Sequence, residues 1–208
     1  MRTLLLLPLV TVSLCSFAGG ESNIIARSDW SKPVSTRYSQ TLRGRMLIAQ
    51  EHSPAHAGPW PETELYLELQ NVSGAVGPPM RIYFDPGRGL RCELLNSLGK
   101  SLPERGTPGS GGGAGACWII LPYDSTIRLR ANAYGYGMKP GDGFSLRLSP
   151  PGSQDWAIRA GDTNTYFLSS SFTVTPPTNH ITQDFDEART IWNGTLELPK
   201  MKIEIPKP

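Results

Sequence analysis

The chain has 208 residues, of which 18% are charged, and a formal net charge of +2 at pH 7. So small an excess of scattered basic residues argues against a nucleic-acid partner. The 22 glycines and 19 prolines lie between short apolar segments, which is typical of a turn-rich domain with a core of its own.

Residues 1–18 have the pattern of a secretory signal peptide. Arg2 is followed by an apolar run from Leu4 to Leu14, and Ser16 and Ala18 occupy the −3 and −1 positions of a cleavage site. The run is shorter than the roughly 20 residues that a spanning helix needs. No later stretch is apolar enough to cross a bilayer, so we expect cleavage after Ala18, no membrane span, and a secreted or periplasmic protein.

Loss of the leader would leave Cys92 and Cys117 as the two cysteines of the mature chain. In an oxidising compartment such a pair is expected to form a disulfide. The bridge would close a long glycine-rich loop, which the chain-entropy model values at roughly 3–4 kcal/mol. Neither cysteine has a second cysteine or a histidine at ligand spacing, which favours a structural bridge over a metal site.

Alternation of apolar and polar residues predicts short strands along most of the mature chain. In residues 63–70, for example, Leu65, Leu67 and Leu69 face one way and Glu64 and Glu68 the other. The best helical segment, residues 184–189, is short. We interpret residues 19–43 as an N-terminal extension and residues 44–208 as one domain. The expected strands lie at 45–50, 63–70, 80–84, 90–95, 117–121, 127–131, 144–148, 166–174 and 201–205.

The strand at 63–70 ends in Asn71-Val72-Ser73-Gly74, which is both a turn signal and a glycosylation sequon. Asn193-Gly194-Thr195 is a second sequon. Turn chemistry explains both asparagines without any sugar, and we predict that the first stretch forms the turn that ends the strand. Whether either asparagine is ever glycosylated stays open.

Short strands separated by frequent turns predict an all-β fold, namely an immunoglobulin-like antiparallel β-sandwich of about 7–9 strands with long loops. Gly161-Asp162 before Tyr166, with Leu168 two places later, has the spacing of a tyrosine corner. An ordinary aromatic in a strand explains Tyr166 equally well.

Several stretches together resemble a group of uncharacterised exported bacterial proteins whose shared module is an immunoglobulin-like sandwich. They are LYLELQNVSG, RIYFDPGRGLRCELLNSLGKSLP, a tyrosine-bearing strand and WNGTLELPKMKIEI, within residues 44–206. The chain is also distantly similar to the sandwich of the bacterial intracellular proteinase inhibitor (BsuPI type), although the leader argues against an intracellular inhibitor. The resemblance implies the fold and brings no catalytic residues.

Candidate chemistry is sparse. His52 and His56 are four residues apart, but Pro54 prevents a helix that would bring them to one metal, and His180 stands alone. We therefore expect solvated histidines, no metal, no cofactor and no catalytic residue.

Aromatic residues offer the remaining candidates for binding. Tyr134 and Tyr136 lie in a glycine-rich loop that could contact a partner, or they could pack in a hairpin. Trp118 and Trp192 are expected to cap the ends of the core.

The sequence thus predicts an exported, non-enzymatic module for protein interaction or structure, with an unknown protein or glycan partner. The first alternative is a carbohydrate-binding module that uses Tyr134 and Tyr136. The second is a metal-dependent hydrolase, which would require His52, His56 and an acidic residue to converge.

Overall fold

The computed structural model describes residues 23–51, 62–74, 79–102, 116–131, 144–148, 156–159, 164–176 and 189–204. Within these ranges the chain is built from antiparallel strands and one short helix, which confirms the predicted all-β class. The elements are β1 (Asn23–Arg27), β2 (Val34–Ser35), β3 (Thr41–Glu51), β4 (Glu62–Asn71), β5 (Met80–Phe84), α1 (Pro86–Gly89), β6 (Leu90–Leu95), β7 (Cys117–Leu121), β8 (Thr126–Arg130), β9 (Phe144–Leu148), β10 (Trp156–Arg159), β11 (Tyr166–Val174) and β12 (Gly194–Ile203).

The strands pair into sheets of different sizes. The largest has the order β1-β3-β4-β8, with β2 pairing along β3, and a second has the order β12-β11-β6. Two-stranded sheets are formed by β5 with β7 and by β9 with β10. The strand predicted at residues 63–70 is present as β4, and it lies centrally, between β3 and β8.

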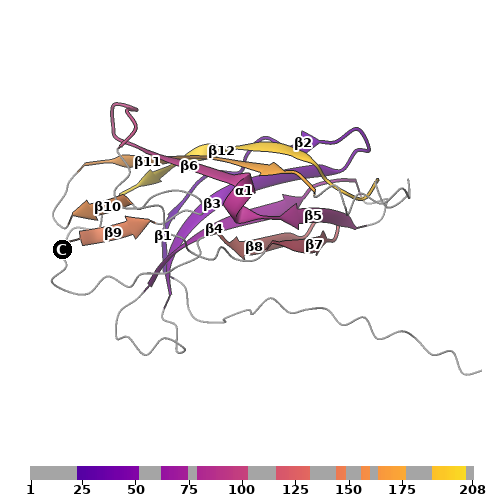
Figure 1. The fold of residues 1–208 in the computed structure, drawn as a ribbon, viewed down its shortest axis with the longest axis horizontal. Coiled ribbons are helices and arrows are strands. Elements are labelled where there is room, and N and C mark those ends of the chain that lie inside the picture. The colour runs from indigo at the N-terminus through magenta and orange to yellow at the C-terminus, as the bar shows by residue number, and fades with distance from the viewer. Residues whose placement is uncertain are drawn as a thin grey trace, which may run out of the picture.

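Strands of the two larger sheets contribute apolar side chains to one core (Figure 1). Apolar side chains of β3, β4, β11 and β12 belong to this core, and the alternation predicted a buried face on each of these strands. The sheets approach closely at Gly44, where an added Cβ would lie 3.1 Å from the side chains of both Leu196 and Leu198. The immunoglobulin-like β-sandwich topology stays a prediction.

Residues before the predicted domain boundary at 44 contribute to the largest sheet. Strand β1 pairs antiparallel with β3, from Asn23 opposite Gln50 to Arg27 opposite Leu47, and β2 pairs with the start of β3. Between them, Ser28 and Ser31 accept hydrogen bonds through their hydroxyl oxygens from the backbone N–H groups of Met46 and Gly44. The boundary at 44 therefore falls inside β3.

The turn predicted at Asn71-Val72-Ser73-Gly74 is present. The Asn71 side-chain oxygen accepts from the Ser73 backbone N–H at 3.0 Å, and the Ser73 hydroxyl accepts from the Thr41 N–H at 2.8 Å. The Asn71 amide nitrogen also donates to the Leu121 carbonyl at 3.0 Å, and the residue is buried. The turn thus ties the end of β4 to β3 and β7.

The predicted core position of Trp192 is confirmed, since its side chain is fully buried. Its indole Nε1–H donates to the Val34 carbonyl at 3.1 Å, while its backbone N–H donates to the Arg81 carbonyl at 2.9 Å. One residue therefore links β2 and β5 to the segment that leads into β12.

Other predictions meet the structure only in part. Tyr166 begins β11 and is buried, but Gly161 and Asp162 lie outside the described residues, so the tyrosine corner stays a prediction. The helix predicted at 184–189 lies almost wholly outside them as well. None of the helices in the described ranges has the length and apolar character required to cross a membrane.

Candidate functional site

Two surfaces of the described residues gather side chains that are suited to binding. The first, here called the aromatic patch, consists of Arg81 and Tyr83 on β5 with Trp118 and Ile120 on β7. The register places Arg81 opposite Ile120 and Tyr83 opposite Trp118. Because neighbouring side chains of a strand alternate between faces, these four share one face, while Met80, Ile82 and Ile119 fill the core on the other. Arg81, Tyr83 and Trp118 are half-buried, and Tyr83 also packs against the core.

Contacts within the aromatic patch fix its geometry. The Tyr83 and Trp118 rings meet edge to face, with centroids 5.3 Å apart and planes at 62°. The Arg81 guanidinium lies 5.0 Å from the centre of the Trp118 ring, within the range of a cation–π interaction. Ile120 is 63% exposed and adds an apolar side chain to this face.

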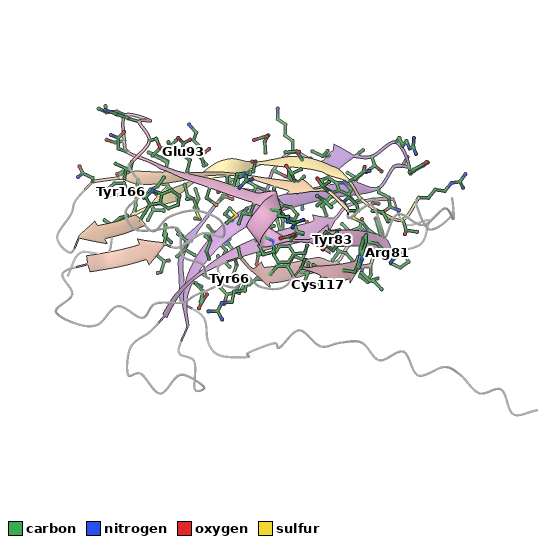
Figure 2. All side chains as sticks on the ribbon, in the orientation of Figure 1. Tyr66, Arg81, Tyr83, Glu93, Cys117 and Tyr166 are labelled. Carbon is green, nitrogen blue, oxygen red and sulfur yellow. The ribbon has the colours of Figure 1, made fainter. Side chains whose placement is uncertain are left out.

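The aromatic patch stands on a strand that is anchored along its other edge. The Arg81 N–H donates to the Thr190 carbonyl at 2.8 Å, and the Arg81 carbonyl accepts from the Trp192 N–H. Figure 2 shows Arg81 and Tyr83 close to Cys117, away from the end of the molecule where Tyr166 lies. The strand that carries Arg81 and Tyr83 is therefore hydrogen-bonded along both edges.

The second surface is the outer face of β3, β4 and β8, where charged side chains form a ladder. Arg45, Glu68 and Arg128 are direct neighbours across the three strands. The Nε groups of Arg45 and Arg128 donate to different oxygens of Glu68, at 2.5 and 2.9 Å. Arg130 binds Glu64 through both Nε and Nη2. Each carboxylate is thus paired.

The ladder leaves β4 buried on both faces, whereas the sequence predicted one buried face. Glu64 and Glu68 are only 2% and 5% exposed, because the arginines of the neighbouring strands lie over them. Burial works to raise the pKa of Glu68, but the hydrogen bonds and charges of Arg45 and Arg128 outweigh it and hold the pKa below its usual value. Glu68 is therefore ionised at neutral pH.

The two cysteines are free thiols in the structure, and both lie on strands whose side chains reach the core. Burial raises the pKa of the Cys92 thiol to about 11, although the Ser170 hydroxyl, which donates to its sulfur at 3.4 Å, acts in the opposite direction. Such a thiol is protonated at neutral pH and a poor nucleophile. The Cys92–Cys117 disulfide stays a prediction, which thiol titration of the unfolded mature protein would test.

The raised pKa of Cys92 predicts a pH-dependent stability in the reduced protein. The folded state binds the Cys92 thiol proton more tightly than the unfolded state does. The protonated thiol therefore contributes fully to the free energy of unfolding below about pH 9, and this contribution is lost as the pH rises to about 11. We expect a loss of about 2–3 kcal/mol across this window relative to a Cys92→Ala variant. Urea unfolding with a phosphine reductant at several pH values measures it. A constant difference between the two proteins would contradict the prediction.

Sequence reasoning misplaced one residue and left others untested. Trp118 was expected to cap an end of the core, but it is half-buried against the Tyr83 ring and is not among the described residues that form the core or pack against it, so that prediction is wrong. The second sequon differs from the first, since Asn193 is exposed. The remaining candidates lie outside the described residues: Tyr134, Tyr136, His52, His56 and His180.

No group of three or more potential metal ligands occurs within the ranges that the structure describes. Comparison of the chain with protein-family models, curated proteins and solved structures found no match. Arg81, Tyr83 and Ile120 were missed by sequence reasoning. Alternation in MRIYF and CWIIL could have placed each on an outward face, but only the register brings them together.

Proposed function

We propose that the chain is an exported, non-catalytic β-sandwich module that binds a protein partner through the aromatic patch. The observation that carries the proposal is the gathering of Trp118, Tyr83 and Arg81 around an exposed Ile120. Tryptophan, tyrosine and arginine are the residue types that dominate binding energy in protein interfaces. Because these residues lie on two paired strands, little conformational entropy is lost when they bind a partner.

A carbohydrate-binding module is less well supported by the same residues. Sugar rings stack on exposed aromatic faces. In the aromatic patch the rings stand at 62° to one another, and the Arg81 guanidinium lies over the Trp118 ring. This arrangement offers an apolar anchor with a positive charge, and no flat platform spans the two rings.

Replacing Ile120 by glutamate is expected to abolish partner binding without unfolding the protein. Ile120 is 63% exposed and lies opposite Arg81, so the new carboxylate has water and a cation beside it. A charge at the centre of an apolar contact would lower the captured amount about tenfold or more. Affinity enrichment from the extracellular fraction of the source organism, quantified by mass spectrometry, compares the variant with the wild type.

The matched control is Leu98→Glu, because Leu98 is 89% exposed and lies outside the aromatic patch. Proteins captured by the wild type and by Leu98→Glu, and lost with Ile120→Glu, would support the proposal. The proposal would have to be abandoned if both variants capture the same proteins as the wild type. Thermal melting of all three proteins checks that each is folded.

A further inference from the structure

Arg43 and Arg45 hold their guanidinium groups over one ring, that of Trp30. The two guanidinium carbons lie 4.9 and 4.2 Å from the ring centroid. The arginines leave the same face of β3, two residues apart. Trp30 is fixed beside them because Ser31 exchanges hydrogen bonds with Gly44, the residue between the two arginines, at 2.8 and 3.0 Å. We call Arg43 and Arg45 the arginine pair.

Each guanidinium of the arginine pair is also held at its Nε. Arg43 Nε donates to the Gln70 side-chain oxygen at 2.7 Å, and Arg45 Nε donates to Glu68 at 2.5 Å. The hydrogen bonds that Arg43 and Arg45 make to the described residues all use Nε, which leaves their Nη groups for a ligand, and the Arg45 side chain is 19% exposed. A guanidinium oriented in this way presents a planar fork of donors that matches a carboxylate.

The charge around Trp30 is unbalanced. Arg43 and Arg45 lie over Trp30, and Arg128 lies farther along the same face, where it shares Glu68 with Arg45. Asp29 and Lys32, which flank Trp30 in the sequence, carry opposite charges, so these six side chains have a net charge of +2. This excess of two positive charges at one end of a sheet face is as large as the formal net charge of the whole chain. A local excess of this kind attracts and orients a negatively charged partner even when the protein as a whole is almost neutral.

We propose that the arginine pair binds carboxylates of an acidic, extended segment of a protein partner. Alternate side chains leave one side of an extended strand about 6.5–7 Å apart. Arg43 and Arg45 leave β3 with this repeat. Alternate carboxylates leave an extended peptide with the same repeat. The inference rests on the proposed function, since it assumes that the partner is a protein. The arginine pair would be a second, positively charged contact surface besides the aromatic patch.

A fluorescent ten-residue peptide with alternating glutamate and threonine tests the arginine pair by anisotropy at low salt. We expect the mature protein to bind it, and the double variant Arg43→Gln/Arg45→Gln to bind about tenfold or more weakly. A second double variant, Arg43→Lys/Arg45→Lys, keeps both charges and removes the forks, and it should also lose affinity. Melting curves verify that each variant is folded.

The control variant is Arg88→Gln, because the Arg88 side chain is 92% exposed and lies on α1, outside this face. It should bind the peptide as the wild type does. The inference is overturned if the wild type fails to bind, or if Arg88→Gln weakens binding as much as the double variants do.

Two further probes separate the acidic peptide from other anions. A peptide of the same composition with its glutamates in one block should bind more weakly than the alternating one, and equal affinity would overturn the inference. Tighter binding of a short oligothymidylate or of inorganic phosphate would overturn it too, by indicating a phosphate site. The Ile120→Glu variant should bind the peptide normally, so a failure here and a failure of the aromatic patch are distinguishable.

Discussion

Replacing Trp192 by alanine is expected to lower the free energy of unfolding by about 3–5 kcal/mol. The indole is fully buried in the main core, and its removal would leave a cavity that the strands around it cannot close. The change also removes the 3.1 Å hydrogen bond that the Trp192 Nε1–H donates to the Val34 carbonyl. Loss of this bond weakens the attachment of β2 to the core. Urea unfolding with an unchanged m-value measures the loss.

The Trp192→Phe variant separates packing from hydrogen bonding. It keeps an aromatic ring in the core but leaves the Val34 carbonyl without its donor, and we expect a loss of about 2 kcal/mol. A loss below about 1 kcal/mol for Trp192→Ala would contradict the position of this side chain in the core.

Gly89→Ala is expected to destabilise the protein by about 3 kcal/mol. A Cβ at this position would lie 2.4 Å from the Thr173 carbonyl oxygen and 3.2 Å from the Phe172 ring. The first of these atoms belongs to the backbone of β11, where Thr173 pairs with Thr195 of β12, so it cannot move without disturbing that pairing. Either α1 moves away from β11 or the strand is displaced. Thermal and urea unfolding measure the effect.

Gly87→Ala is the matched control, because it lies in the same short helix. A Cβ there would meet only the Asp85 side-chain oxygen, at an ordinary 3.6 Å. Alanine has the higher helix propensity and restricts the unfolded chain, so we expect an unchanged or slightly higher stability, by up to about 1 kcal/mol. Equal losses for both variants would mean that the clash at Gly89 is not the cause.

Strands were predictable because burial on one face leaves a period of two in the sequence. Leu65, Leu67 and Leu69 of β4 are core residues, as that period indicates. The alternation of apolar and polar residues is weaker where a strand is short or lies at the edge of a sheet. Strand β2 has only two residues, and β1 carries a register shift between Ile24 and Ala26, so neither showed a regular pattern.

The two candidate binding surfaces could not be predicted from the sequence. Trp118 and Tyr83 are 35 positions apart in the sequence, and no local signal indicates that they meet. Their contact depends on the register of β5 with β7, which sets which side chains share a face. The same holds for Trp30, which reaches the arginine pair only because the segment after β1 runs along β3.

By itself the sequence determined the all-β class, most strand positions and the turn at Asn71, because these depend on the alternation of side chains and on local hydrogen bonding. Only the tertiary structure decided the environment of each polar or aromatic side chain. Glu68 alternates like a solvent-facing residue, yet it is buried because Arg45 and Arg128 arrive from two neighbouring strands. A pleated strand turns alternate residues to opposite faces. Ile119 and Leu121 of β7 occupy the inner face, so the large aromatic side chain of Trp118 lies on the outer face.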